Sequence, residues 1–596
     1  MTMYGILKRP WKKYIFFFLV YMVLTIILRI IGTETWDLNK QNNILIWSAL
    51  FCTSICSVYE YSRKAICTYL LVCLLYTSAE YIKMLVGIPL RGITIFDSFV
   101  FSVIIVGVIL FANQLIAKCP YLIIKRSMLL ITYLFFGFFL ILPLLFWGYY
   151  LVSGQLLSAD ILLTLFQTNL SETRSYLANQ NITRWIISGV LIFVILLISL
   201  YRIHKINIIH KQSKLLIVFV LLSLIFLGNT MKTKVMNIYF INTICNTYQA
   251  LNSFKAYAEG KTLREQKLQT LHDVSIAAGQ GGVYVLVIGE SESRDHMSLY
   301  GYNRENTPWL QQLQTVHGTI VFNHAYSCHT HTVAALTYAL SEKNQYNDIQ
   351  SADAYSIMES AKAAGYQTYW ISNQERFSTW DTPVAEIAST ADHQVLVNGN
   401  AGEQVSTLYY DEALVNYIPD LTTVHNAFII IHLMGSHQSY SDRYPGQFNQ
   451  YSGKGKIVDT YDNSILYNDA VLQNLYLKIH NNPDYKAWIY FSDHGDDADA
   501  NKGHEASKFT FTMAHIPLIM NFSDSFIETH RDKYNVLKNH SAAYWSNDLL
   551  YDLLIDLMDI DGVNINQDLD LASKQYNRNE GNLMTMHGQR SVVDDI

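Results

Sequence analysis

The sequence predicts an N-terminal membrane domain of five to seven helices, followed by an α/β domain with a mostly parallel sheet. The 596 residues are 51% hydrophobic, but nearly all of the long apolar runs lie in the first 228. After residue 281, short aliphatic runs alternate with helical patterns, which is typical of strands joined by helices. The net charge of −6 is small, and no basic block outside the membrane flanks indicates nucleic-acid binding.

The membrane domain is predicted from apolar segments that approach the roughly 20 residues needed to cross a bilayer. The last segment is short and the third contains Glu80 and Lys83, so the number of spans is given as a range. The first follows a basic cluster and lacks a small-residue cleavage site, which predicts a retained anchor. The segments are residues 14–31, 42–59, 65–82, 97–116, 128–150, 184–201 and 214–228.

Loop charges predict the orientation of this domain. With seven spans and a cytoplasmic N-terminus, most Lys and Arg residues of the loops lie on the cytoplasmic side, as the positive-inside rule requires. The odd number of spans then places the C-terminal half outside the cytoplasm. In the outer segment 151–183, an amphipathic stretch predicts either an interfacial helix or a connecting loop. We expect a transmembrane domain over 1–228, bridging helices over 229–280 and a soluble domain over 281–596.

The soluble domain is predicted from short apolar strands and the helical patterns between them. Residues 283–289 form an aliphatic, largely β-branched run bounded by glycines, which indicates a strand buried on both faces. Four further runs have a similar length and apolar character. The predicted strands are 283–289, 366–371, 427–434, 486–492 and 516–522, and the predicted helices are 351–364, 408–417 and 461–480.

Residues that can bind metals follow several of these strands. Glu290 ends the first strand, Asp493 and His494 end another, and His437 and His504 stand in the segments after two strands. Ligands in open α/β sheets bind at the carboxyl ends of the strands, so we expect these side chains to converge. Carboxylates together with imidazole favour zinc, and a set without thiolates leaves a position open for catalysis. Taken singly, each residue has a simpler explanation, a solvated strand end or a structural histidine.

A nucleophile is predicted in the polar segment 327–332, directly before a helical pattern. The exposed N–H groups and the dipole of a helix N-terminus attract phosphate. Thr330 and Thr332 are both candidates, the spacing leaves the choice open, and either hydroxyl is also explained as a helix cap. The thiol of Cys328 is a poor phosphoryl acceptor beside a hard metal site. A disulfide between Cys328 and Cys245 has no support from spacing.

Several short motifs occur in an order that resembles a known enzyme family. They are Gly289-Glu290-Ser291 with Arg294, Leu299-Tyr300-Gly301-Tyr302, Ser327-Cys328-x-Thr330-x-Thr332, Met434-Gly435-Ser436-His437, Tyr461-Asp462-Asn463-Ser464-Ile465 and Ser492-Asp493-His494-Gly495. The ordered set resembles the membrane-bound phosphoethanolamine transferases of Gram-negative envelopes, which have an alkaline phosphatase/sulfatase-like catalytic domain. The resemblance covers most of the chain, loosely in the membrane half and tightly from about 283 to 510.

The resemblance implies zinc ligands, catalytic histidines and a region near the donor. The implied Zn²⁺ ligands are Glu290, Asp493, His494 and Thr332, of which Thr332 is also the nucleophile. The other matching positions are His437 and His504, which contact the phosphoethanolamine group and act in catalysis, and Asn373 and Gln374, which lie near the donor.

By this resemblance, the protein transfers phosphoethanolamine from phosphatidylethanolamine to an envelope glycolipid through a covalent intermediate on Thr332. The implied location is the inner membrane, with the catalytic domain in the periplasm. His329, His331 and the lack of soluble-domain disulfides depart from lipid A-modifying members and favour a branch acting on lipopolysaccharide core sugars or another envelope glycan. The alternatives are a phosphoglycerol transferase, a membrane-anchored sulfatase or phosphodiesterase, and a non-enzymatic binding or sensor protein.

Overall fold

In the computed structural model, the described residues form two compact units, an N-terminal unit up to Gln249 and a C-terminal unit that begins at Ala250 and also includes Leu163. The structure describes residues 59–60, 63–85, 92–163 without 118 and 160, 182–204, 209–210, 235–270, 274–374, 383–398, 409–421 and 424–595, and isolated positions between 15 and 23 and between 218 and 234.

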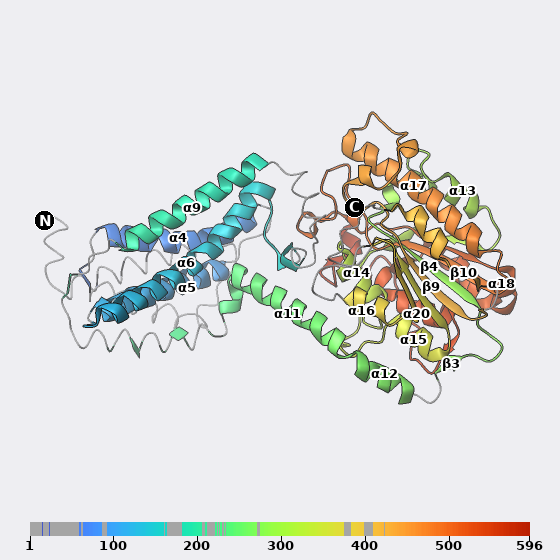
Figure 1. Cartoon of the computed structure of the whole chain (residues 1–596), viewed down its shortest axis with the longest axis horizontal. Coiled ribbons are helices and arrows are strands. Elements are labelled where there is room, and N and C mark those ends of the chain that lie inside the picture. Colours follow the sequence, from blue (N-terminus) through green and yellow to red (C-terminus); the bar gives the residue numbers. More distant parts are fainter. Residues whose placement is uncertain are drawn as a thin grey trace. The chain divides into compact units, whose positions relative to one another are not determined.

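The N-terminal unit contains long apolar helices (Figure 1). Two of the described helices, Leu122–Ser153 and Ile182–Tyr201, are long and apolar enough to cross a membrane. The first, second and seventh predicted spans and residues 164–181 lie largely outside the described residues, so the number of spans is not confirmed. The elements are α4 (Arg63–Leu85), α5 (Gly92–Ala117), α6 (Leu122–Ser153), α9 (Ile182–His204) and the strand pair β1 (Tyr59–Glu60) and β2 (Ile209–His210).

The charged residues that interrupt the third apolar segment have protein partners. Glu80 is buried, and its carboxylate accepts hydrogen bonds from the Lys83 ammonium at 2.7 Å, the Ser98 hydroxyl at 3.1 Å and the Tyr239 backbone N–H at 3.0 Å. A buried charge is tolerated in an apolar bundle when it is paired and hydrogen-bonded in this way. The interruption at Glu80 is therefore compatible with one continuous helix, α4.

The region predicted to bridge the two halves contains the short helix η1 (Val235–Asn237), α11 (Tyr239–Glu259), α12 (Lys261–Thr270) and the short strand β3 (Ser275–Ile276). Helix α12 is attached to α15 (Ile357–Ala364) by a buried ion pair. The Arg264 guanidinium donates to both oxygens of Glu359, at 3.1 and 3.2 Å, and also to the Tyr257 carbonyl oxygen at 2.8 Å.

The C-terminal unit is built on a seven-stranded sheet with the order β5-β11-β10-β4-β9-β7-β8. The five predicted strands are confirmed to within two residues at each end. The sheet contains β4 (Val283–Gly289), β5 (Thr319–Val321), β7 (Gln367–Ser372), β8 (His393–Leu396), β9 (Ala427–His432), β10 (Tyr485–Ser492) and β11 (Leu518–Phe522).

The prediction of a mostly parallel sheet was wrong, because the sheet is mixed. Strand β11 pairs antiparallel with both β10 and β5. For the next strand to run parallel to β10, the connection would have to cross back to the end of the sheet where β10 begins. Residues 493–517 contain only the short 3-10 helices η8 (Ala506–Lys508) and η9 (Phe511–Met513), so the chain re-enters the sheet from the edge where β10 ends.

Helices cover both faces of the sheet (Figure 1). Side chains of β4 alternate between the two cores, with Leu286 and Ile288 on one face and Val285 and Val287 on the other. The first core contains residues of α14 (Thr332–Ala339), α15, α16 (Pro383–Ser389) and α20 (Leu550–Leu557), and the second those of α13 (Pro308–Gln314), α17 (Lys456–Ile479) and the 3-10 helix η4 (Asp411–Tyr417).

The three predicted helices differ from the observed ones, and the predicted helix 461–480 is α17, which already begins at Lys456. The predicted helix 351–364 begins only at Ile357, because Ser356 and Glu359 form a capping box that fixes the start. The predicted helix 408–417 is the 3-10 helix η4. The remaining elements include η2 (Arg294–His296), β6 (His324–Tyr326), α18 (Asp524–Thr529), α19 (Arg531–Asn539), β12 (Tyr544–Ser546), β13 (Ile560–Asp561), β14 (Met584–Thr585) and β15 (Arg590–Ser591).

The register of the central strands decides which polar residues meet. Strands β4, β9, β7 and β10 are parallel neighbours and end at the same edge. Gly289 pairs with Ser492, so the residues that follow, Glu290 and Asp493, emerge side by side. The sheet therefore brings together two carboxylates that are about 200 residues apart in the sequence.

Candidate metal centre and active site

Two carboxylates and an imidazole meet at the carboxyl edge of the sheet. Ligand atoms of Glu290, Asp493 and His494 all lie within 4.8 Å of one another, and none of the three residues is more than 1% exposed. His494 Nε2 lies 3.5 Å from Glu290 Oε1 and 3.4 Å from Asp493 Oδ2. Asp493 Oδ2 is buried without a hydrogen-bond partner. Since unpaired buried carboxylate oxygens are costly, this set suits a divalent cation, and the mixture of oxygen and imidazole ligands suits zinc.

The backbone around this cluster is held in unusual conformations. Ser291 is left-handed, with φ of 62°, and its N–H donates to Asp493 Oδ1 at 3.0 Å while its hydroxyl donates to Glu290 Oε1 at 2.8 Å. Gly435, which follows β9, has φ of 50°, and a Cβ there would lie 2.8 Å from the Glu290 backbone N and O. Only glycine permits such a close approach, so these positions set the direction of the Glu290 side chain.

Burial sets the protonation of the cluster. Burial and the neighbouring Asp493 raise the pKa of the Glu290 carboxyl well above its usual range. Burial lowers the pKa of His494, which favours the neutral imidazole, the form that binds metals. A bound cation would offset the repulsion between the two carboxylates.

The hydroxyl of Thr332 lies directly on this cluster. It donates to Glu290 Oε2 at 3.0 Å and lies 3.3 Å from His494 Nε2. The alternative hydroxyl, that of Thr330, is fully buried and has no hydrogen-bond partner. Cys328 is also fully buried, and burial raises the pKa of its thiol well above the usual range. Of the three candidate nucleophiles, the structure places Thr332 against the metal-binding groups.

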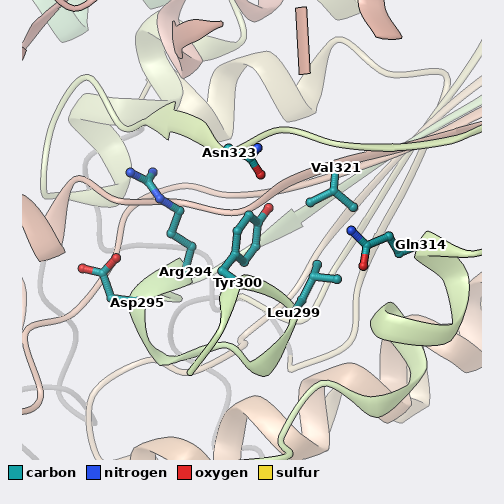
Figure 2. A pocket seen from close by; sticks show the side chains of 7 residues that line it. All are labelled: Arg294, Asp295, Leu299, Tyr300, Gln314, Val321 and Asn323. Carbon is teal, nitrogen blue, oxygen red and sulfur yellow. The ribbon is translucent and has the colours of Figure 1, made fainter. Parts of the chain in front are cut away.

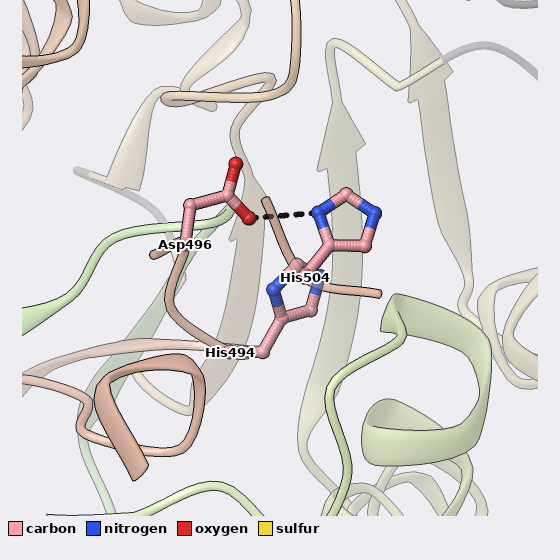
Figure 3. Close-up of side chains that lie close together, drawn as sticks. All are labelled: His494, Asp496 and His504. Carbon is pink, nitrogen blue, oxygen red and sulfur yellow. Dashed lines mark hydrogen bonds and ion pairs between the residues drawn. The ribbon is translucent and has the colours of Figure 1, made fainter. Parts of the chain in front are cut away.

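A second group of side chains surrounds His504. Its Nδ1 lies 2.7 Å from Asp496 Oδ1, and His494, Asp496 and His504 offer ligand atoms within 4.8 Å of one another (Figure 3). Burial disfavours a charge on His504, but Asp496 raises its pKa above the usual value. Tyr440 donates its hydroxyl to the other oxygen of Asp496. Asp496 was not among the predicted site residues, although its position two residues after His494 was a usable signal.

His437 lies beside this group, with its ring centroid 6.3 Å from that of His504. Burial and then Arg443 lower the pKa of His437 to about 3. Arg443 Nη2 lies 3.4 Å from His437 Nδ1, and its Nε donates to the His437 carbonyl oxygen at 3.1 Å. The structure thus brings His437 and His504 together as a neutral and a more readily protonated histidine.

The two predicted donor-region residues have different surroundings. Gln374 donates to Glu290 Oε2 at 3.5 Å and to the Leu433 carbonyl oxygen at 2.7 Å. Asn373 instead donates to Asp411 at 2.8 Å and accepts a hydrogen bond from Asn398 at 2.8 Å. Gln374 therefore contacts the cluster, whereas the side-chain groups of Asn373 hold the neighbouring loop.

A pocket of about 350 Å³ lies elsewhere in the C-terminal unit (Figure 2). It contains none of the predicted site residues. Its lining residues are Arg294, Asp295, Leu299, Tyr300, Gln314, Val321 and Asn323. The candidate active site is thus located by its chemistry and not by this cavity. Cys245 and Cys328 are both free thiols.

Comparison with known proteins agrees with this fold. The sulfatase family model matches residues 283–560. Phosphoethanolamine transferase EptC of Escherichia coli strain K12 is 29% identical over 425 residues, which cover 64% of this chain and 72% of EptC. Phosphoethanolamine transferase CptA of Salmonella typhimurium is 28% identical over 440 residues, which cover 68% of this chain and 76% of CptA.

A solved structure extends the similarity to the N-terminal half. The integral membrane protein lipooligosaccharide phosphoethanolamine transferase A (EptA) from Neisseria meningitidis superposes with a TM-score of 0.56 at 18% identity. It covers 85% of this chain and 97% of the EptA chain, and it supports the fold alone. Together with the ordered motifs, these matches show that the chain has a sulfatase-like domain and is similar to phosphoethanolamine transferases.

Proposed function

We propose that this enzyme transfers phosphoethanolamine from phosphatidylethanolamine to an envelope glycolipid, the lipopolysaccharide core or lipid A. The observation that carries the proposal is the Thr332 hydroxyl, which lies within 3.3 Å of both Glu290 and His494. Glu290, Asp493 and His494 would hold a zinc ion, with the Thr332 oxygen as the fourth ligand. Zinc bound there would lower the pKa of that hydroxyl and favour the alkoxide.

The remaining chemistry belongs to residues of the chain. The Thr332 oxygen attacks the phosphorus, the bond from phosphorus to the diacylglycerol oxygen breaks, and a phosphoethanolamine–threonine intermediate forms. His504, held by Asp496, supplies the proton that the diacylglycerol oxygen takes up. An acceptor hydroxyl or phosphate then attacks the same phosphorus, Thr332 leaves, and His504 takes up the acceptor's proton if it has one. His437 donates a hydrogen bond to a phosphoryl oxygen.

The donor and the acceptor are both lipids, which gives the apolar N-terminal half a role beyond attachment. We place the chain in the inner membrane with the transmembrane domain over 1–228, the bridging helices over 229–280 and the catalytic domain over 281–596 in the periplasm. The two apolar helices Leu122–Ser153 and Ile182–Tyr201 support a membrane location. The histidines His329 and His331 beside the nucleophile support the branch that acts on core sugars.

The test compares Thr332→Ala with Thr330→Val in the purified full-length enzyme. Thr332→Ala should abolish both diacylglycerol release and the phosphoethanolamine adduct on the peptide that contains residue 332, while zinc remains bound. Thr330→Val removes a hydroxyl that does not contact the cluster and should retain transfer. Unchanged turnover in Thr332→Ala would overturn the assignment.

Mass spectrometry of envelope glycolipids from cells with and without the gene identifies the acceptor, and a phosphoglycerol increment would contradict the proposed group.

A further inference from the structure

The C-terminal residues 583–595 form a hairpin that contacts the segment carrying the nucleophile. Strand β14 pairs antiparallel with β15, and the connection between them contains three consecutive left-handed residues, Met586, His587 and Gly588, with φ of 52°, 51° and 78°. Left-handed conformations at non-glycine residues persist only where surrounding contacts hold them. This hairpin, here called the C-terminal strap, lies beyond the residues matched by the sulfatase family model.

The strap is hydrogen-bonded to the backbone just before Thr332. The Thr585 hydroxyl donates to the Ser327 carbonyl oxygen at 2.6 Å, and the His587 N–H donates to the Cys328 carbonyl oxygen at 2.9 Å. Thr585 is fully buried, so water does not replace its bond. The two bonds hold consecutive carbonyl groups of the segment that leads into α14.

The same segment is bonded on its other side to the candidate metal ligand Asp493. The Ser327 hydroxyl and the Asn547 amide both donate to the Asp493 carbonyl oxygen, the second at 2.9 Å. The Asn547 oxygen also accepts from the Cys328 N–H at 2.8 Å. Ser327 and Cys328 are thus held between the strap and the strand end that presents Asp493 and His494.

The strap also contacts α14, the helix that begins at Thr332. The His587 ring stacks on Tyr338 with the centroids 4.0 Å apart and the planes at 10°. Its Nε2 lies 3.2 Å from the Ala334 carbonyl oxygen. Burial lowers the pKa of His587 to about 4, so the ring is neutral and its one N–H serves this bond. The strap therefore contacts both the segment before the nucleophile and the first turns of its helix.

The far end of the strap is fixed by charged groups. Asp595 accepts hydrogen bonds from His515 Nε2 at 2.7 Å and from the Tyr326 hydroxyl at 2.8 Å. His515 Nδ1 lies 2.8 Å from Asp295 Oδ2 on the segment that follows β4. Leu583 and Val592 of the strap are buried with Tyr326. Both ends of the strap are therefore attached around the nucleophile segment.

We propose that the C-terminal strap positions Thr332 against Glu290 and His494, with Thr585 and His587 as the positioning residues. The inference rests on the proposed role of Thr332 as the nucleophile. Loss of the strap contacts lets the segment 327–332 shift. A shift of about 1 Å at a reacting group is enough to lower turnover about a hundredfold.

The experiment uses the full-length enzyme and the variants Thr585→Val and Thr585→Ser, with Thr390→Val as the control. Thr390 is a matched control for Thr585, because it is also buried and its hydroxyl also donates to a carbonyl oxygen, that of Ile387 at 2.6 Å. Thr585→Val should lower kcat about tenfold to a hundredfold and leave KM for phosphatidylethanolamine unchanged. Thr585→Ser should restore kcat, and Thr390→Val should not change it.

Amide hydrogen exchange of residues 327–339 tests the strap independently of activity. Thr585→Val should speed exchange there, while Thr390→Val should not. If Thr585→Val does not fold, His587→Asn, which tolerates the left-handed backbone but loses the ring, decides the same question. If amide exchange of residues 327–339 is unchanged in a folded variant, the proposed positioning role of the strap is wrong, even if the enzyme is active. A wild type that does not transfer phosphoethanolamine would overturn the proposed function, and the exchange result would still decide the strap.

Discussion

At the scale of single residues, the candidate metal centre depends on how closely two backbone segments approach. Glu290 is directed by the left-handed Ser291 on one side and by Gly435 on the other. Thr332 then reaches Glu290 and His494 from the start of α14. The cluster is therefore sensitive to displacements much smaller than a side chain, and residues that bind no metal contribute to its geometry.

Gly435→Ala tests this sensitivity. The added methyl group would contact the Glu290 backbone at 2.8 Å in a left-handed conformation, so Glu290 must move. We expect zinc affinity to fall about tenfold to a hundredfold, as for other changes that disturb metal-supporting residues. Titration calorimetry of the metal-free enzyme measures this. Gly446→Ala is the control, because no atom lies within 4 Å of the added methyl group, and it should leave the affinity unchanged.

At the scale of elements, α12 is joined to α15 by the buried ion pair of Arg264 and Glu359. Arg264 is fully buried and Glu359 is 4% exposed, whereas the pair formed by Lys267 of α12 and Asp353, which precedes α15, is exposed. Removing one partner of a buried pair leaves the other charge uncompensated. An exposed pair loses little, because water replaces it.

Arg264→Ala should therefore destabilise the protein by about 3–5 kcal/mol. The matched variant Lys267→Ala should cost no more than about 1 kcal/mol. Chemical denaturation followed by tryptophan fluorescence compares the two. Equal losses in both variants would contradict the importance of burial for this ion pair.

The attachment of the C-terminal strap should depend on pH. Burial acts against a charge on His515, but Asp295 and Asp595 raise the pKa of its imidazole. Burial likewise acts against a charge on the two carboxyl groups, but their pKa values are lowered, chiefly through His515. Arg294 is the other charged group that acts on His515. The stabilisation by His515 is complete below its unfolded pKa of about 6.5 and is lost as pH rises through the raised folded pKa. The stabilisation by the carboxylates of Asp295 and Asp595 is lost as pH falls below about 3.8.

We therefore expect the wild type to lose more thermal stability than Asp595→Asn when the pH is raised from about 6.5 to 9. A difference of about 1 kcal/mol would appear as roughly 2 °C in Tm. Differential scanning calorimetry at the two pH values measures it. Asp594→Asn, a change at the neighbouring exposed residue, should behave as the wild type. Parallel pH dependence of wild type and Asp595→Asn would show that the His515 contacts do not stabilise the strap.

At the scale of the whole molecule, the chain combines an apolar helical unit with a sulfatase-like unit. Helix α9 illustrates the difference, since Ile186 and Phe193 are about 60% exposed in the helix. Such a surface is stable in lipid and not in water. With an odd number of spans and a cytoplasmic N-terminus, we predict that the catalytic unit lies on the side opposite the cytoplasm.

A reporter enzyme that is active only outside the cytoplasm tests this orientation. Fused after Ile596, it should be active, because the C-terminal unit is expected in the periplasm. Fused after Pro120, in the predicted cytoplasmic loop between α5 and α6, it should be inactive. The reverse pattern, or equal activity at both positions, would contradict the predicted orientation.

Much of the fold could be predicted because the signals are local. Each central strand is a short apolar run, and the residue that follows a strand is known once the strand is known. Glu290, Asp493 and His494 were found in this way, and the ordered motifs indicated the family. The antiparallel β11 could not be found, because the direction of a strand depends on the path of its connection and not on its own residues.

The sequence by itself determined which groups the proposed chemistry would use, a carboxylate and histidine cluster at the ends of neighbouring strands and a hydroxyl as the proposed nucleophile. The tertiary structure decided that the Thr332 hydroxyl, which the resemblance had implied, lies against this cluster and that the Thr330 hydroxyl does not, because the backbone turns the two side chains differently. It also decided that Asp496 contacts His504 and that residues 583–595 are hydrogen-bonded to the segment before Thr332. Contacts between residues far apart in the sequence are set by strand register and close packing, which no local pattern records.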